Sequence, residues 1–538
     1  MVSAAGTLDS VGGREPVAME MDNSKPRKKI PRNKFVIACA VLASTNSILF
    51  GYDVGVMSGA VIFIKKDLKI SDVQEEVLIG SLNIISLVGA ALAGRTSDAI
   101  GRRWTMALAA FIFLVGALVM AVSPSFAWLM VGRSVAGIGV GYALLIAPVY
   151  TAEVAPAASR GCLTCFPEIF INVGILIGYI ANYALAGLPG NVNWRVMLGV
   201  GAVPPLFLGI AVLMMPESPR WLVMRNRNDD AMKVLLRTSV NQAEASERLD
   251  QIMEGIRYAQ VNASVKKSSN PNEISKSDGE GKWHELYRPS RAIRRMLIIA
   301  LGIQFFQQAG GIDATVYYSP VTFKTAGIKS QEGILGATMA VGFAKAGFVI
   351  VAAFLIDKVG RRPLLLTSAI GSTVSLVALA SALAIIGKKS TVGMGSEAAS
   401  YLAVIAACSN VAFFSVGMGP VNWVLGAEIF PLRLRAKAAS LGVGVNRGMS
   451  GVVSMTFISI SNAITVPGTF YLFAGVSALC SIFIYFCVPE TKGKTLEEIV
   501  ESFHVKARGS PDKTAMGPSE LELGNSRAIP VKAETAVS

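Results

Sequence analysis

Long apolar stretches recur along the chain between Phe35 and Pro489, and they limit the possible folds more than any other feature. Each has about 18 to 25 mostly apolar residues, enough for a helix to cross a hydrocarbon core of about 30 Å at a rise of about 1.5 Å per residue. We therefore predict an all-α membrane protein with twelve transmembrane helices. Their approximate spans are 35–64, 77–97, 104–122, 126–150, 161–185, 195–215, 293–320, 332–356, 363–386, 400–426, 437–462 and 468–488.

The composition excludes an ordinary water-soluble globular protein, because 52% of the residues are hydrophobic and only 16% are charged. The formal net charge is +14, and basic residues cluster before the first apolar stretch and in the loops after the second and sixth. The positive-inside rule places these segments, and with them both termini, on the cytoplasmic side. The lipid bilayer is therefore the expected partner of this charge, and nucleic acid is not.

Residues for catalysis or metal binding are scarce. The only histidines, His284 and His504, fall in predicted cytoplasmic segments, and the CxxC spacing of Cys162 and Cys165 has no partner cluster. The glycine-rich run from Gly137 to Gly141 lies in an apolar stretch and favours close helix packing over nucleotide binding. We expect no enzyme activity, no cofactor and no metal.

Three short motifs recur in the same order, about 260 to 275 residues apart, after helices 2, 4 and 6 and again after helices 8, 10 and 12. The pairs are Asp98–Arg103 with Asp357–Arg362, Glu153–Arg160 with Glu428–Arg435, and Pro216–Leu222 with Pro489–Leu496. Such a duplication predicts two six-helix bundles in the same orientation. The predicted units are a disordered basic tail (1–34), the N-terminal bundle (35–215), a cytoplasmic linker with short helices (216–292), the C-terminal bundle (293–490) and a cytoplasmic tail (491–538).

Further motifs accompany the repeat. They are Gly51-Tyr-Asp53, Gly132-Arg133, Pro148-Val-Tyr150 before Glu153, Gln307-Gln308 with Tyr317-Tyr318, and Gly419-Pro420 with Trp423. With them the chain resembles the sugar porter family of the major facilitator superfamily over about residues 35 to 500, and within it the plant polyol and monosaccharide transporters. The resemblance implies the major facilitator fold and alternating access, in which the two halves rock around a central solute site. We expect a monomer.

The repeated loop motifs carry matched acids and arginines, which suggests an inner gate. Their alternative role is that of a topology signal and a solvated surface. We favour carboxylates and arginines that pair across the seam between the halves and hold the cytoplasmic side closed while the site faces outward. The predicted gate residues are Asp98, Arg102, Arg103, Glu153, Arg160, Asp357, Arg361, Arg362, Glu428 and Arg435.

Asp53 and Arg133 are charged residues inside apolar stretches, where ionisable side chains are costly and usually functional. Counted along their helices, the two lie at similar depth in the membrane. An aspartate beside an arginine stays ionised and takes up a proton when it loses that partner. The resemblance supports a proton carrier, because proton-coupled sugar porters have an aspartate here. The alternative is a static ion pair between helices 1 and 4.

The seventh apolar stretch predicts a solute site, because Gln304, Gln307 and Gln308 share one helical face ahead of a possible break at Gly310-Gly311. Amides donate and accept hydrogen bonds, which suits the hydroxyls of a polyol. The alternative is polar contact between helices. By resemblance, the solute-binding residues are Phe50, Glu168, Gln307, Gln308, Asp313, Tyr317, Trp423 and Asn446.

Three charged positions depart from the commoner sugar porter pattern and match polyol transporters: Glu168, Asp313 and Lys345. We expect Lys345 to pair with one of the two acids. Arg447 departs too, and the sequence suggests no role for it. The predicted function is proton-coupled symport of polyols such as sorbitol, mannitol or inositol, with monosaccharides as further candidates, at the plasma membrane. An uncoupled facilitator and a transporter-like nutrient sensor are the alternatives.

Overall fold

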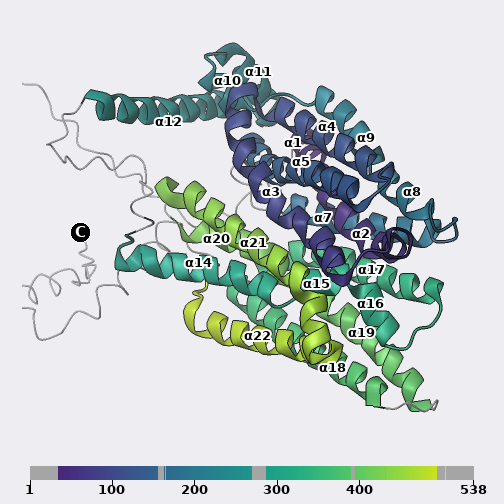
Figure 1. The fold of residues 1–538 in the computed structure, drawn as a ribbon. Coiled ribbons are helices and arrows are strands. Elements are labelled where there is room, and N and C mark those ends of the chain that lie inside the picture. Colours follow the sequence, from purple (N-terminus) through teal and green to yellow (C-terminus); the bar gives the residue numbers. More distant parts are fainter. Residues whose placement is uncertain are drawn as a thin grey trace, which may run out of the picture.

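The computed structural model describes residues 34–155, 163, 165–268, 286, 288–388, 394–430, 432–492 and 503. Every regular element within these residues is a helix, so the predicted all-α fold is confirmed. Figure 1 shows the helices of the two halves as two groups that lie against each other.

Within the described residues, the first half contains eight helices that form six membrane segments. They are α1 (Lys34–Ser44), α2 (Asn46–Leu68), α3 (Asp72–Ile100), α4 (Arg102–Ala121), α5 (Phe126–Val154), α7 (Phe166–Leu185), α8 (Asn193–Val200) and α9 (Val203–Met214). Between the halves lie α10 (Pro219–Met224), α11 (Asn228–Thr238) and α12 (Gln242–Ser268), which share a small apolar cluster of their own.

The second half has the same plan with more interruptions. Its helices are α14 (Arg291–Ala309), α15 (Ile312–Tyr317), α16 (Ser319–Thr325), α17 (Gln331–Val359), α18 (Arg361–Lys388), α19 (Met394–Val416), α20 (Met418–Ile429), α21 (Leu432–Ile464) and α22 (Val466–Cys487). Gly311 separates α14 from α15 with a φ of +78°, and a Cβ at this position would lie 2.3 Å from the ring of Phe473. Only glycine fits there without strain, and the predicted break in this stretch is confirmed.

Ten helical segments of 20 to 35 residues are long and apolar enough to cross a membrane, counted over the described residues. The two remaining predicted spans are helical as well, and they correspond to α14–α16 and to α21. The first is interrupted at the glycine pair, and the second includes polar residues such as Asn446 and Arg447. Both are therefore less apolar or less continuous than an ordinary span, because they carry the polar groups of the interior.

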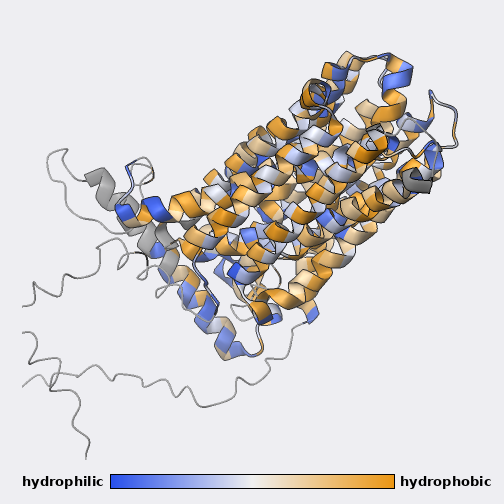
Figure 2. Cartoon of the chain, turned by 90° about the horizontal axis from the view of Figure 1, so that it is seen from below, coloured by the Kyte–Doolittle hydropathy of each residue, from blue (hydrophilic) through white to orange (hydrophobic). Residues whose placement is uncertain are grey.

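The outer faces of the bundle are apolar and the polar residues gather at its ends, as Figure 2 shows. Large side chains such as Phe111, Phe207, Phe354 and Phe486 are more than half exposed. So much exposed apolar surface indicates contact with lipid rather than water.

The two halves contact each other where α3 packs on α21 and α7 packs on α17. Gly80 of α3 lies so close to α21 that a Cβ would be 2.4 Å from Met455. Nearby, the carboxylate of Glu76 accepts hydrogen bonds from the backbone N–H and the hydroxyl of Ser459, at 2.7 and 2.5 Å. These contacts lie in the first half of α3, so they close the seam at the end of the bundle away from α10 and α11.

Candidate solute and proton site

The first polar centre of the interior is the ion pair between Asp53 of α2 and Arg133 of α5. The Nη1 atom of Arg133 lies 2.5 Å from Oδ2 of Asp53, and the side chains are 0% and 2% exposed, respectively. The other guanidinium nitrogens of Arg133 donate to the backbone carbonyls of Leu78 and Ile79 in α3, at 2.9 and 3.1 Å. The structure thus brings the predicted pair together, and Arg133 links its own helix, α5, to α2 and α3.

Glycines bring α2 close to α7 on the face of α2 opposite Asp53. A Cβ on Gly51 or Gly55 would collide with the backbone carbonyls of α7, at 2.0 and 2.3 Å, so α2 and α7 touch through their backbones. On the other face Asp53 is buried against Arg133 of α5, where an unpaired charge would be costly.

A second polar centre is a network of amide side chains between α14, α20 and α21. The Nδ2 atoms of Asn422 and Asn446 both donate to the side-chain carbonyls of Gln304 and Gln307. Gln307 donates in turn to the carbonyl of Met418 at 2.7 Å, and Gln308 donates to Asn446 at 3.2 Å. These buried amides bind one another here, so a polyol would bind by exchanging these bonds for bonds to its hydroxyls.

Charged side chains from both halves form a third centre, which we call the charged cluster: Glu168 of α7, Asp313 of α15, Lys345 of α17 and Arg447 of α21. Glu168 interacts electrostatically with the other three. Although Glu168 belongs to the first half, its Oε1 atom reaches the second half, where it lies 3.7 Å from the position that a Cβ of Gly419 would occupy. The cluster therefore spans the seam at the depth of the predicted solute site.

The predicted direct pairing of Lys345 with an acid is wrong. Among the described residues, no ion pair within 4 Å joins Lys345 to Glu168 or Asp313, although the three interact electrostatically. The carboxylate of Asp313 accepts a hydrogen bond from the hydroxyl of Ser450, in α21, instead. The charges stand apart, which leaves them available to the hydroxyls of a bound solute.

Three aromatic residues complete the predicted solute site. Tyr317 is buried, and its hydroxyl has no hydrogen-bond partner among the described residues. Tyr317 interacts with Asp53 and Arg133 as well as with Asp313 and Arg447, so it lies between the proton pair and the charged cluster. Trp423 is partly buried in α20, next to Asn422 of the amide network. Phe50 faces Arg447 from the other half, with the guanidinium carbon 4.8 Å from the ring centroid.

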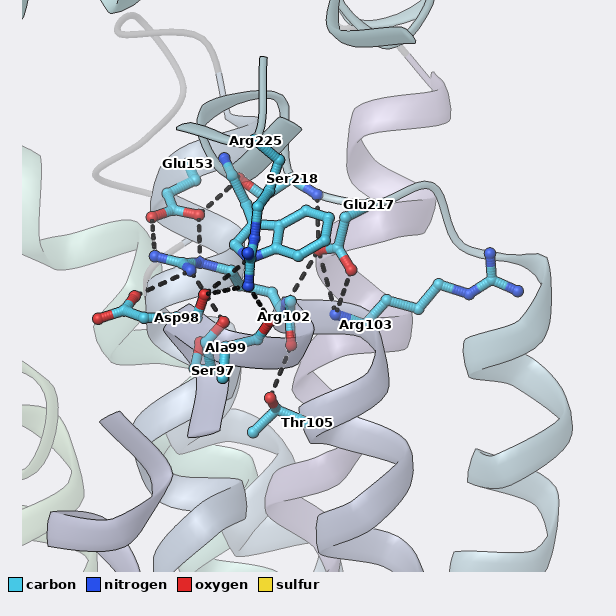
Figure 3. Close-up of polar contacts among 12 residues, drawn as sticks. Ser97, Asp98, Ala99, Arg102, Arg103, Thr105, Glu153, Glu217, Ser218 and Arg225 are labelled. Carbon is cyan, nitrogen blue, oxygen red and sulfur yellow. Dashed lines mark hydrogen bonds and ion pairs between the residues drawn. The ribbon is translucent and has the colours of Figure 1, made fainter. Parts of the chain in front are cut away.

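At the end of the first half near α10, the repeated motifs form the cluster drawn in Figure 3. Arg102 binds Glu153 through two parallel bonds of 2.9 and 3.0 Å, and Asp98 accepts a third bond from the same guanidinium at 3.1 Å. Glu217 accepts the backbone N–H groups of Arg102 and Arg103 at the start of α4. A carboxylate suits this position because helix N-termini expose unpaired N–H groups.

Burial raises the pKa of Glu217, while the hydrogen bonds from the backbone of Ser218, Arg103 and Arg102 act in the opposite direction. The hydroxyl of Ser218 donates to Glu153 at 2.5 Å and so joins the capping carboxylate to the ion pair.

The second half repeats this cluster. Arg361 binds Glu428 at 2.9 Å, and Thr491 donates to the other carboxylate oxygen at 2.7 Å. Glu490 accepts the backbone N–H groups of Arg361 and Arg362, each at 3.0 Å, at the start of α18. Burial raises the pKa of Glu490, but its bonds from four backbone N–H groups outweigh that influence and leave the pKa below its usual value.

The two ion pairs described here do not test the predicted pairing of gate residues across the seam, because that prediction concerns the state in which the site faces outward, and it stays a prediction. Arg102 with Glu153 and Arg361 with Glu428 each lie within one half, because the carboxylate comes from the end of a helix in the same bundle. Asp98 also pairs within its half. Arg160 lies outside the described residues, as do the side chains of Asp357 and Arg435.

Several residues of these sites were not in the predicted set. Glu217, Ser218, Glu490 and Thr491 belong to motifs that the repeat had marked, but spacing alone does not reveal their contacts: the two glutamates cap helices, and Ser218 and Thr491 donate to Glu153 and Glu428. Asn422 stands next to Trp423, and its place in an otherwise apolar stretch was the available signal. In the described part of the chain, no group of three metal-binding side chains could hold an ion.

Comparisons with known proteins agree with this arrangement. Residues 39–503 match the family model described as sugar (and other) transporter. Polyol transporter 5 of Arabidopsis thaliana is 51% identical over 522 residues, 95% of each chain, and the glucose transporter GlcP of Staphylococcus epidermidis is 34% identical over 467 residues, 87% of this chain and 96% of its own.

Solved structures of a bacterial transporter share the fold. One is the major facilitator superfamily proton:xylose symporter XylE bound to 6-bromo-6-deoxy-D-glucose, with a TM-score of 0.71, 27% identity and coverage of 88% of this chain and 100% of that one. Another is a partially occluded inward open conformation of XylE from E. coli, with a TM-score of 0.70, 25% identity and coverage of 86% and 99%.

Proposed function

The chain belongs to the sugar transporter family, and we propose that it is a proton-coupled symporter of polyols in the plasma membrane, with both termini in the cytoplasm. Family membership makes it a multi-pass membrane protein that transports sugars or polyols and not an enzyme. The observation that carries the proposal of coupling is the fully buried pair of Asp53 and Arg133.

In the proposed cycle, Asp53 takes a proton when the site opens to the outside and its bond to Arg133 is broken. Protonation removes the cost of an unpaired carboxylate in a low-dielectric interior, and solute then binds to the loaded carrier. After the halves rock, the proton leaves to the cytoplasm and Arg133 pairs with Asp53 again. The paired state, together with a seam closed at the Glu76 end, supports assignment of the present conformation to the inward-facing part of this cycle.

A polyol is the solute that fits the interior best. The amide network supplies carbonyls and N–H groups, and the charged cluster adds two strong acceptors, Glu168 and Asp313, and a strong donor, Lys345. Linear polyols expose hydroxyls along their whole length, so both centres can be used by one molecule. The names of the polyol transporters of Arabidopsis thaliana, about half identical to this chain, support the same choice.

Expression in oocytes under voltage clamp tests the proposal. Sorbitol, mannitol, inositol and glucose are applied at a neutral and at an acidic external pH. We expect an inward current for the polyols that grows with acidity. The variant Asp53→Asn should lose this current at least tenfold and retain exchange of labelled polyol, because a neutral side chain cannot carry the proton.

The matched control is Asp67→Asn, which removes another carboxylate of α2 that pairs with an arginine, here Arg195 at 2.9 Å, in a more exposed position. We expect its current to persist. Polyol accumulation by Asp53→Asn against a gradient, driven by external acid, would exclude Asp53 as the carrier. Uptake by the native protein that ignores pH would instead favour an uncoupled facilitator.

A further inference from the structure

A pocket opens at one end of the first half, between the start of α4 and the short helices α10 and α11. Its volume is about 310 Å³, at the lower end of the range of about 300 to 1,000 Å³ that is usual for small-molecule sites. None of its lining residues belongs to the three polar centres of the interior. The proposed transport cycle therefore leaves this pocket without a use.

Three bases line the pocket, and they come from two different elements. Arg103 belongs to the start of α4, and Figure 3 shows that its side chain extends away from Arg102 and Glu153. Arg227 directly precedes α11 and Lys233 lies within it, and their side chains are 59% and 75% exposed. An anion that enters the pocket would therefore meet cations from both elements.

Two acids also line the pocket, but their bonds leave the bases with donors to spare. Glu217 caps α4 by accepting backbone N–H groups, including that of Arg103. Asp230 accepts two hydrogen bonds from Arg227, at 3.0 and 2.7 Å, and one from Lys233 at 3.1 Å. Because a guanidinium group has five N–H donors and an ammonium group has three, about three and two of them remain for a ligand. Phosphate oxygens are the acceptors that such donors bind best.

The pocket adjoins an apolar stripe on the outer face of α4. Trp104 lines the pocket and is 53% exposed. Phe111, Val115 and Leu118 lie further along the same face of the helix and are 36 to 62% exposed. Tryptophan is typical of the boundary between the hydrocarbon core and water, so the charged pocket lies where lipid head groups lie. A molecule with its phosphate in the pocket could place acyl chains along α4.

We propose that this pocket binds the phosphate head group of an anionic phospholipid, whose acyl chains lie along the exposed stripe of α4. The three bases bind the phosphate, as basic pockets beside membrane helices do. A zwitterionic head group is matched less well, because it brings its own cation to a pocket that already has more bases than acids. Glu217 forms part of the pocket and also caps α4, so a bound lipid would adjoin the pair of Arg102 and Glu153. This inference does not depend on which solute the chain transports.

Energy transfer from the tryptophans to a phosphatidylinositol with a pyrene-labelled acyl chain tests the proposal, on the purified full chain in detergent micelles. We expect unlabelled phosphatidylinositol to displace the probe at concentrations about tenfold lower than phosphatidylcholine, whose head group is neutral overall. Inositol 1-phosphate, the soluble head group, should displace the probe poorly because it has no acyl chain to contact α4.

The double variant Arg227→Gln with Lys233→Gln removes two bases of the pocket. It should weaken binding of phosphatidylinositol on the order of twentyfold, since each base near a membrane surface contributes a factor of about five. The matched control, Arg220→Gln with Arg257→Gln, removes the same charge from exposed positions of the same segment outside the pocket. Its affinity should stay within about twofold of that of the native protein, because distant exposed charges are screened.

An equal loss of affinity in the two double variants would overturn the proposal, because total charge and not the pocket would then attract the lipid. Phosphatidylcholine that displaces the probe as well as phosphatidylinositol would reduce the site to non-specific lipid contact and overturn it too. Inositol 1-phosphate that competes as well as the lipid would identify a site for soluble phosphates instead. If the pocket double variant fails to fold, Lys233→Gln alone decides, with an expected loss of about fivefold that an unchanged affinity would contradict.

Discussion

The two halves carry the same cluster at the same end of the bundle, but its described ion pair is more buried in the first half. Arg102 donates two hydrogen bonds to Glu153, and their side chains are 8% and 10% exposed. The described pair of Arg361 and Glu428 has one bond, and its side chains are 14% and 21% exposed. The same motif, with the same spacing, therefore gives ion pairs that differ in burial.

What the halves share is the capping of a helix. In each, a glutamate that follows the last helix of the half accepts the N–H groups at the start of α4 or α18. The glycine before each helix has a positive φ, +97° at Gly101 and +113° at Gly360, and lies against that glutamate. This geometry explains why glycine and glutamate recur in both copies. The turn requires a glycine because of its positive φ, and it leaves room for the glutamate that caps the helix.

The largest expected difference between the halves is in the ion pairs. Glu153→Gln should lower the free energy of unfolding by about 3 kcal/mol and Glu428→Gln by about 1 kcal/mol. The first loss is larger because Arg102 is the more buried arginine, so water compensates less for its lost partner. Thermal unfolding followed by size-exclusion chromatography measures both. Asp230→Asn, which breaks an exposed pair with Arg227, is the control and should have no measurable effect.

An equal loss of stability in both variants would contradict the proposed difference in strength. If neither variant lost stability and cysteine probes at this end of the seam became more reactive in both, the pairs would act as a gate between the halves after all.

A smaller effect is expected from the capping glycines. Alanine at Gly101 would place its Cβ 2.4 Å from Oε2 of Glu217, whereas at Gly360 the corresponding distance to Glu490 is 2.9 Å. Both variants also strain a backbone that only glycine adopts readily, at a cost of about 1 to 3 kcal/mol. We expect Gly101→Ala to be the worse of the two in the same unfolding assay.

The control for these variants is Gly475→Ala in α22, where a Cβ would meet nothing within 4 Å. It should be neutral or slightly stabilising, since alanine favours a helix. A greater loss at Gly360 than at Gly101 would show that the cap of the second half is the stronger one.

The smallest effect concerns pH. Because the pKa of Glu217 is raised in the folded protein, its contribution to stability is fully present below pH 4.5, the usual pKa of a glutamate. This contribution is lost as the pH rises through the pKa of the folded state. The lowered pKa of Glu490 works in reverse: its contribution is present above 4.5 and is lost as the pH falls through the folded pKa. The cost of Glu217→Gln should therefore shrink from acid to neutral pH, while that of Glu490→Gln should grow.

Melting temperatures of both variants relative to the native protein, measured from about pH 4 to 7, test these opposite slopes. Each slope should amount to about 2 °C or less over this range, since one carboxyl group in a large protein has little weight. Parallel slopes would mean that burial does not distinguish the two caps.

The helical body and much of the site could be predicted along the chain. The length of the apolar stretches predicted the membrane segments, and helical spacing placed Gln304 and Gln307 on one face. In the structure both side chains belong to one amide network. The pairing expected for Lys345 was wrong, and the carboxylate of Asp313 binds Ser450, over a hundred residues away along the chain. The contact of Glu76 with Ser459 was not predicted either, because it joins helices of different halves.

On its own, then, the sequence determined the membrane-spanning helices, the twofold repeat, the break at Gly310-Gly311 and the pairing of Asp53 with Arg133. These depend on hydrophobic length, on residue spacing and on the cost of isolated charges in hydrocarbon, all of which act along or between predictable helices. Only the tertiary structure decided which charges meet within a half, which face each other across the seam, and how deeply each is buried. Those outcomes depend on how helices rotate and pack, and side chains from distant segments compete for the same partners.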